Sequence, residues 1–140
     1  MKTLAVRKGD RLTIRAIAFP SASGERDRCA TLAFFQEHAG LRGAEFERLA
    51  ALLTETAENG PPQNEKKFKD LPGTDGLFEF KTFGGLRLLC FWDTDSLICT
   101  HGYLKDGQKA PRHEIERAEK LRAEYIEAKR TGTLSHANPK

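Results

Sequence analysis

The sequence predicts an α+β fold, in which an antiparallel sheet forms a meander and carries two N-terminal helices and one C-terminal helix. Three observations indicate this class. An apolar stripe at helical spacing ends at Gly60-Pro61-Pro62. Strand-like segments separated by turn residues then occupy 77–104, and a second amphipathic stretch begins at Pro111. The expected order is one strand, two helices, four strands and a final helix.

The first half of the chain predicts one strand and two helices. Residues 11–19 are rich in β-formers and end at Pro20, which predicts a strand. Residues 28–39 show a short helical pattern that ends near Gly40. The clearest helix follows, because one apolar stripe repeats at i, i+3, i+4, i+7 and i+11 through Phe46, Leu49, Ala50, Leu53 and Ala57.

The second half predicts the meander. A short polar strand is expected near 64–71, and residues 77–83 then alternate apolar and polar side chains. Residues 86–93 are apolar on both faces, which is typical of a central strand. Residues 96–104 form the next strand. The four segments follow one another through short turns, so neighbouring strands are expected to pair in antiparallel fashion.

The expected final helix runs from about Pro111 to Lys129. At 140 residues, the chain fits a single domain over 1–130, followed by a flexible tail over 131–140. No apolar run is long enough to span a membrane and no secretory signal is evident, so we expect a cytoplasmic protein. The three cysteines are odd in number and form no C-x-x-C pair, which favours reduced, structural thiols.

The charge of the chain permits nucleic-acid binding without establishing it. The net charge is +3 and the pI is about 8.8. Cleaving RNA without a metal requires a base for the 2′-hydroxyl, cations for the phosphate and an acid for the leaving oxygen. Neighbouring predicted strands and the loop after them offer candidates for these catalytic roles, namely Lys81, Arg87, His101 and Lys105. No metal site and no small-molecule cofactor are expected.

The predicted hairpin turn decides whether two of these cations share a face. We expect Gly84-Gly85 to be a two-residue turn. If Phe83 pairs with Leu86, we expect Lys81 and Arg87 to point to the same side of the sheet. Arg87 has a structural alternative, since an Arg among leucines is also satisfied by an ion pair, for example with Glu79.

Further residues are candidates for holding RNA. Tyr103 can stack on a base, or it can cap the core with its hydroxyl in water. His101 can equally be a core histidine bonded to backbone. Lysines before the meander and in the loop after it can bind RNA phosphates. The ordinary alternative is that they are solvated surface lysines. They are Lys66, Lys67, Lys69 and Lys109.

Three stretches in this order resemble the HigB-like, phage-associated branch of the RelE/ParE toxin superfamily. They read LPGTDGLFEFKTFGGLRLLCFW, HGYLKDGQKAP and HEIERAEKLRAEY, within roughly residues 60–128. The resemblance implies a RelE/ParE-like fold. It also implies a toxin of a type II toxin–antitoxin pair that binds the small ribosomal subunit and cuts mRNA through 2′-hydroxyl attack. The implied partner is a cognate helix-turn-helix antitoxin.

By this resemblance, Arg87 matches one sheet arginine of the family and Lys81 stands where the family usually has another. Lys105 and Lys109 match its loop lysines, and His101 and Tyr103 match its strand end. The chain departs from the family pattern at Lys81, which lacks the guanidinium fork, and at Asp106 and Gly107, where Lys and Thr are usual. Two alternatives remain: a ParE-like inhibitor of DNA gyrase that cuts nothing, and an inactive prophage-derived binding protein.

Overall fold

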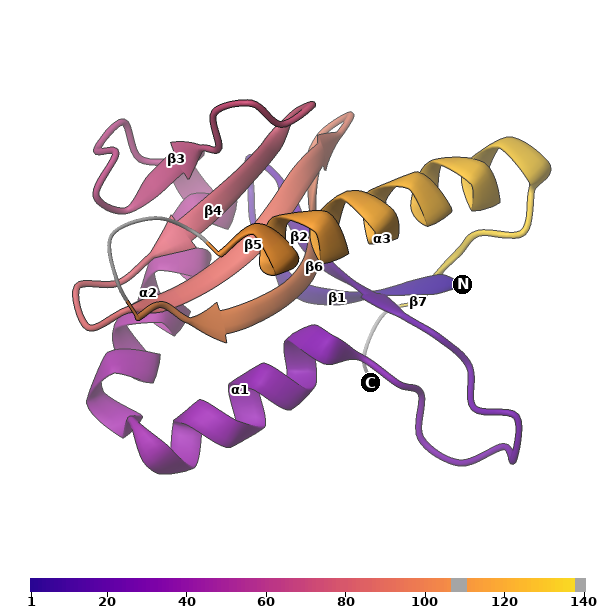
Figure 1. The fold of residues 1–140 in the computed structure, drawn as a ribbon, viewed down its shortest axis with the longest axis horizontal. Coiled ribbons are helices and arrows are strands. Elements are labelled where there is room, and N and C mark those ends of the chain that lie inside the picture. Colours follow the sequence, from indigo (N-terminus) through magenta and orange to yellow (C-terminus); the bar gives the residue numbers. More distant parts are fainter. Residues whose placement is uncertain (107–110, 138–140) are drawn as a thin grey trace.

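The computed structural model describes residues 1–106 and 111–137. Three helices and seven strands follow one another in this part of the chain (Figure 1). Their bounds are β1 (Lys2–Lys8), β2 (Thr13–Ala18), α1 (Ala30–Leu41), α2 (Gly43–Asn59), β3 (Phe68–Asp70), β4 (Leu77–Lys81), β5 (Leu86–Asp93), β6 (Ser96–Leu104), α3 (Arg112–Thr131) and β7 (Ser135–Ala137).

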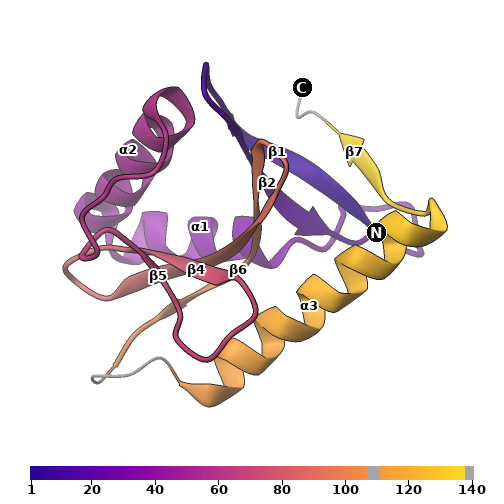
Figure 2. The same cartoon turned by 90° about the horizontal axis from the view of Figure 1, so that it is seen from above.

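A single sheet lies between two helical layers (Figure 2). The strand order across the described sheet is β3-β4-β5-β6-β2-β1-β7. Strand β5 is buried on both faces, since Leu88 and Cys90 pack under α1 and α2, whereas Leu89 and Phe91 pack under α3. This explains why its sequence is apolar at nearly every position.

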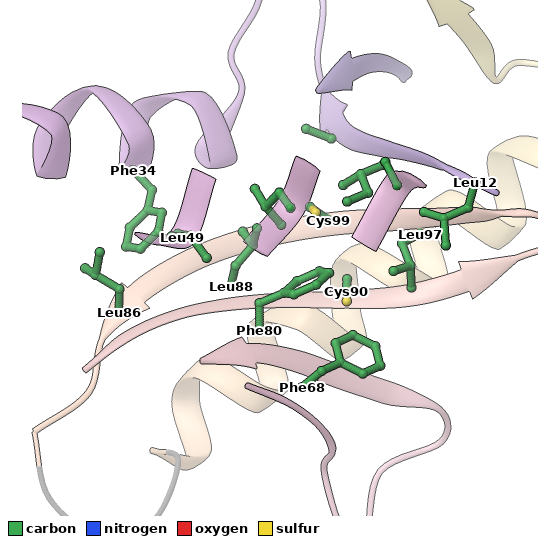
Figure 3. Close-up of a cluster of buried hydrophobic side chains, with 14 residues drawn as sticks. Leu12, Phe34, Leu49, Phe68, Phe80, Leu86, Leu88, Cys90, Leu97 and Cys99 are labelled. Atoms are coloured by element: carbon green, nitrogen blue, oxygen red, sulfur yellow. The ribbon is translucent and has the colours of Figure 1, made fainter. Parts of the chain in front are cut away.

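The face under α1 and α2 is a continuous apolar core (Figure 3). The predicted stripe of α2 supplies Leu49, Leu53 and Ala57 to this core, and all three are buried. Phe34 of α1 packs over Gly102 so closely that a Cβ at residue 102 would overlap the ring. Strand β6 therefore needs glycine at this position to accept α1.

The α+β class, the three helices and the antiparallel run from β3 to β6 are confirmed. The predicted element order and the wholly antiparallel sheet are wrong. Strand β1 precedes the expected first strand, and β2 pairs with β6 in parallel. Strand β1 escaped prediction because its residues, KTLAVRK, mix cations with small apolar side chains and only Thr3 is buried. The strand is held by backbone pairing with β2 and β7, although its sequence lacks the alternating apolar pattern that would have predicted it.

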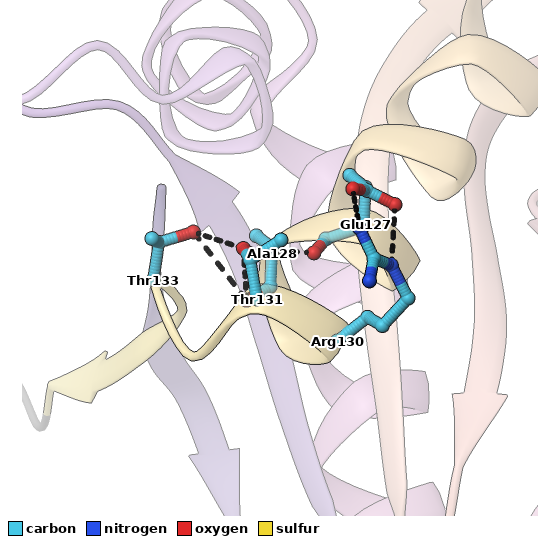
Figure 4. Close-up of polar contacts among 5 residues, drawn as sticks. All are labelled: Glu127, Ala128, Arg130, Thr131 and Thr133. Atoms are coloured by element: carbon cyan, nitrogen blue, oxygen red, sulfur yellow. Dashed lines mark hydrogen bonds and ion pairs between the residues drawn. The ribbon is translucent and has the colours of Figure 1, made fainter.

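Part of the expected tail is a strand. Helix α3 ends at Gly132, which adopts the left-handed conformation with φ +76°. The N–H groups of Thr133 and Leu134 donate to the Ala128 carbonyl at 2.9 and 3.2 Å, and Glu127 pairs with Arg130 on the same turn (Figure 4). The chain thereby turns back, and β7 pairs in parallel with β1. That residues 1–130 form one domain stays a prediction.

Among the described residues, no helix combines the length and the apolar character needed to cross a bilayer. All three cysteines are free, and Cys90 and Cys99 are fully buried. Burial raises the pKa of both of these thiols, which disfavours the reactive thiolate. This agrees with the structural role expected for them.

Candidate nucleic-acid site on the sheet

The face of the sheet that packs against α3 carries a row of polar side chains, which lies past the N-terminal end of that helix. Lys81 of β4 lies directly opposite Arg87 of β5, which lies opposite Tyr103 of β6. Residues directly opposite each other share a face, and this face is the one on which Leu77 and Tyr103 pack with α3 residues. Lys67 continues the row, because its carbonyl accepts a hydrogen bond of 2.8 Å from the Lys81 N–H.

A second row runs beside the first. Lys69 of β3 lies opposite Glu79 of β4, and Leu89 of β5 lies opposite His101 of β6. Glu79 and Leu89 are also paired, so four strands contribute to this row. We call the polar residues of the two rows, together with Lys105 after β6, the cationic corner. It consists of exposed and partly buried lysines, namely Lys67, Lys69, Lys81 and Lys105, and of the buried residues Glu79, Arg87, His101 and Tyr103.

The register of the β4–β5 hairpin differs from the predicted one. Thr82, rather than Phe83, is opposite Leu86, because the Thr82 N–H donates to the Leu86 carbonyl at 3.1 Å. The loop is three residues long and ends at Gly85, whose φ is +107°. The shift matters, since pairing Phe83 with Leu86 would have put Arg87 on the face opposite to Lys81. The two cations share a face through the observed register alone.

The hairpin is held by a residue from α2 that the sequence did not single out. Glu45 accepts hydrogen bonds from the Thr82 hydroxyl and, at 3.0 Å, from the Leu86 N–H. Burial alone would raise the pKa of Glu45, but these hydrogen bonds and nearby Arg42 and Arg87 lower it. Glu45 is 37 residues from Thr82 in sequence, so no local pattern could have indicated this contact.

Arg87 is held by backbone rather than by a carboxylate. Its Nη1 donates to the Thr82 carbonyl at 2.7 Å and to the Leu86 carbonyl at 3.0 Å. The side chain is 9% exposed, and its buried Nε has no partner among the described residues. The alternative ion pair with Glu79 is not formed within the described structure. A guanidinium that bonds only carbonyl oxygens keeps a positive charge that can attract an anion.

Lys81 is electrostatically unusual. Burial lowers the pKa of its ammonium below the ordinary lysine value, and nearby Arg87 lowers it further. Lys105 and Lys69 act in the same direction, while Glu79 opposes them. The Nζ atom donates to the Glu65 carbonyl at 3.3 Å. A lysine with a depressed pKa has a larger neutral fraction and can accept a proton.

Glu79 and Tyr103 form a buried pair inside the cationic corner. The Tyr103 hydroxyl donates to Glu79 Oε2 at 3.3 Å, and both residues are buried. Burial and the Glu79 carboxylate raise the pKa of Tyr103, so its hydroxyl keeps its proton. The carboxylate also supplies a negative charge within a group of cations, which reduces their mutual repulsion.

His101 is 1% exposed and both of its ring nitrogens have partners. Nε2 bonds Glu114 Oε1 at 3.1 Å, and Nδ1 lies 3.2 Å from the Thr100 hydroxyl. Burial lowers the pKa of His101 and Arg117 lowers it further, against the opposing effect of the Glu114 carboxylate. These contacts join β6 to the first turn of α3. Both partners are side chains, whereas the structural alternative for His101 expected a bond to the backbone.

The remaining predicted lysines are distributed unevenly. Lys66 and Lys67 are exposed just before β3, and Lys69 is partly buried on it. Lys105 follows β6 and lies close enough to Lys81 to affect its pKa. Lys109 lies outside the described residues, as does the departure at Gly107. The described residues contain no group of three or more His, Cys, Asp or Glu side chains that could hold a metal ion.

A comparison with known protein families matches residues 40–123 to the family described as Phage derived protein Gp49-like (DUF891). The chain belongs to this family. The matched segment extends from the end of α1 into α3 and includes every described residue of the cationic corner. The Gp49-like family is part of the RelE/ParE-like toxin superfamily. A search of curated proteins found no match.

Proposed function

We propose that this Gp49-like protein is a HigB-like toxin of a type II toxin–antitoxin pair, and that it inhibits translation as a ribosome-dependent mRNA endonuclease. The observation that carries the proposal is the pairing of Lys81 with Arg87 directly across two strands, next to Tyr103 and Lys105. Membership of the RelE/ParE-like superfamily supports it. The cytoplasm, the small ribosomal subunit and mRNA are the corresponding location and partners, and a helix-turn-helix antitoxin is the proposed inhibitor.

Arg87 is the proposed phosphate ligand. Its guanidinium is anchored by two backbone carbonyls and by no carboxylate in the described structure, so it can bind phosphate without first breaking an ion pair. Charge builds up on the phosphate oxygens as the 2′-oxygen attacks phosphorus. A fixed cation stabilises that charge without reorganising during the reaction.

Lys81 is the proposed general base. The neutral amine takes the proton of the 2′-hydroxyl, the O2′–P bond forms and the P–O5′ bond breaks. The products are a 2′,3′-cyclic phosphate and a 5′-hydroxyl, and Lys105 is the proposed donor of the proton to the leaving 5′-oxygen. The lowered pKa of Lys81 supports the role of base, because Arg87 and burial both favour its neutral form.

His101 and Tyr103 have supporting roles in this proposal. The ring nitrogens of His101 are occupied by Glu114 and Thr100, so His101 positions the start of α3 rather than handling protons. Tyr103 is largely buried beside Arg87, so its proposed role is to support the RNA-binding residues from the neighbouring strand rather than to stack on a base. Lys66, Lys67, Lys69 and Lys109 are the proposed contacts to the RNA or ribosomal backbone.

The test is inducible expression of the chain in bacteria, with primer extension on abundant mRNAs. The proposal predicts growth arrest and discrete cuts within codons that disappear when translation is blocked. Arg87→Ala should abolish the cuts, whereas Arg130→Ala, which removes an exposed arginine at the far end of α3, should leave them unchanged. Circular dichroism of each variant checks the fold.

Two outcomes would contradict the proposed activity. Growth arrest with intact mRNA and a DNA-damage response would indicate inhibition of gyrase. Absence of arrest from a folded, soluble product would indicate a binding protein without toxin activity. A third outcome, full cleavage by a folded Arg87→Ala protein, would remove the assigned site while leaving the activity.

A further inference from the structure

Strand β6 is paired along only half of one edge. Strand β2 pairs with its first half, where Thr13 to Ala16 lie beside Ser96 to Cys99. Within residues 1–106 and 111–137, no strand pairs with this edge from Thr100 to Leu104. On the opposite edge, β5 pairs with β6 on both sides of a bulge at Thr100. The second half of β6 is therefore a free strand edge inside the sheet rather than at its margin.

The hydrogen-bonding groups on this edge can be assigned from the register. The Lys105 N–H donates to the Gly85 carbonyl at 2.7 Å, so residue 105 is hydrogen-bonded to β5. Because the pattern alternates in an antiparallel pair, Tyr103 also directs its N–H and C=O toward β5. Gly102 and Leu104 consequently direct theirs toward the free edge, and no other described segment provides them with backbone partners.

Two adjoining cavities run along the free edge. One of about 700 Å³ is lined by Gly102, Tyr103 and Leu104 of β6 together with α1 residues, including Phe34 and Leu41. The other, of about 750 Å³, extends from Thr100 toward the segment before α1 and toward α3. They share Ala30, Ala33 and Arg117 in their linings, so we treat them as one surface, the β6 groove.

Exposed apolar side chains gather along this groove. Leu32, Leu41 and Leu104 are 36%, 73% and 38% exposed, and each lines one of its two cavities. Leu41 stands at the end of α1 and Leu104 at the end of β6. A free strand edge with exposed leucines beside it is typical of a site where a protein segment docks.

The charge of the β6 groove indicates which side chains the bound segment carries. Five arginine and lysine side chains line the groove, namely Arg26, Arg28, Arg42, Arg117 and Lys120, against three carboxylates, Asp27, Glu37 and Glu124. Asp27 is also committed to an ion pair with Lys2 at 2.6 Å. The groove therefore favours a segment that carries acidic side chains.

We propose that the β6 groove binds an extended segment of a partner protein with alternating apolar and acidic residues, which adds as a strand to the free edge at Gly102 and Leu104. Apolar side chains of the segment would contact Leu41, Leu104 and Phe34, and acidic ones would pair with the arginines. The bound segment lies against Tyr103, and so partner binding covers one side of the cationic corner. This inference does not depend on RNA cleavage.

The test uses a displayed library of short random peptides selected on the immobilised full chain. The best peptide is then synthesised and added to the ¹⁵N-labelled protein. The proposal predicts enriched peptides with alternating apolar and acidic residues, and slower amide exchange at Gly102 and Leu104 on binding. Leu41→Glu should weaken binding by at least about tenfold. The matched control Ile126→Glu replaces an exposed apolar residue of α3 outside the groove and should not change the affinity.

Four results would overturn the proposal: enriched peptides that protect other amides, an affinity unchanged by Leu41→Glu, protection of Gly102 and Leu104 by a single-stranded RNA oligonucleotide but by no peptide, or self-association of the chain through this edge. None of these results depends on whether the chain cuts mRNA. A failure here is thus distinguishable from a failure of the proposed nuclease function.

Discussion

The two faces of the sheet are built from the same strands but end differently. Under α1 and α2, apolar side chains continue from Phe68 across to Leu12 and up to Leu86 at the hairpin. Under α3, the apolar cluster stops near Leu89 and Tyr103, and cations replace it beyond the start of the helix. The face under α1 and α2 is therefore an apolar core along its whole length, whereas the face under α3 has charged residues at one corner. Alternation along β4 and β5 makes this division possible.

The largest expected effect concerns the first face. Phe80 is fully buried in the cluster under α1 and α2. Phe80→Ala should lower the free energy of unfolding by about 3–5 kcal/mol, because it removes a large side chain and leaves a cavity. The matched change Phe83→Ala, at a fully exposed residue of the same hairpin, should change it by less than about 0.5 kcal/mol. Urea denaturation measures both, and equal effects would contradict the assignment of the core.

The second prediction separates two roles of Lys81. Lys81→Arg keeps the positive charge but removes a usable base, since the guanidinium stays protonated. If Lys81 is the base, the cleavage rate should fall by about a hundredfold or more while RNA binding persists. Lys8→Arg, at an exposed lysine of β1, is the control. An unchanged or faster rate would instead assign Lys81 to phosphate binding.

The pH dependence of the same reaction provides a further check. The wild-type rate should rise with pH until Lys81 is neutral and then level off, because the neutral amine is the active form. Arg87 lowers the pKa of Lys81, so Arg87→Gln should move this rise to higher pH in whatever activity remains. A rise that does not move would contradict the coupling between the two residues.

Sequence reasoning succeeded where the signal is local. The stripe of α2 and the apolar run of β5 each depend on side-chain spacing within one element, and both elements were predicted. It failed for β1, whose seven residues mix cations with small apolar side chains, and for β7, which is three residues long and pairs with β1 at the other end of the chain. The cationic corner depended on a hairpin register that Glu45 of α2 holds in place, and such a contact is not encoded in the hairpin itself.

The role of His101 illustrates the same limit. As a histidine at the end of an apolar strand, it was a reasonable candidate for proton transfer. Its partner Glu114 lies 13 residues away, beyond the loop that leads to α3. The residue types were visible in the sequence, but whether the ring faced solvent or a carboxylate depended on where α3 packs.

His101 leads to a prediction about stability. Burial lowers its pKa in the folded state, so at pH values below the unfolded pKa the unfolded chain binds a proton more readily. The folded state should therefore lose stability as pH falls below the unfolded pKa of histidine, because the buried ring resists protonation. Urea titrations of His101→Gln should show a weaker loss, while His113→Gln, at an exposed histidine, should behave as the wild type. An identical slope in all three proteins would contradict the buried, neutral ring.

The smallest expected effect concerns the lysines at the margin of the cationic corner. Lys66 and Lys67 are exposed, so replacing both with Ala should weaken RNA binding modestly and equally for all sequences. The slope of log K against log salt should decrease by roughly 0.7 for each phosphate of a single strand that the protein no longer neutralises. Lys8→Ala is the control at a site away from the corner. Fluorescence anisotropy with a labelled oligonucleotide measures the affinity and its salt dependence for each variant. An unchanged slope would show that these lysines do not contact the RNA.

The most direct test of the cationic corner uses a reconstituted translation reaction with an end-labelled mRNA. Wild-type protein should cut the message only during translation and leave 2′,3′-cyclic phosphate ends. Arg87→Lys keeps the charge but loses the planar guanidinium fork, and should cut at least about a hundredfold more slowly with an unchanged fold. Equal cleavage by wild type and Arg87→Lys, or no cleavage by folded wild type, would contradict the assignment of this corner as an RNA-cleaving site.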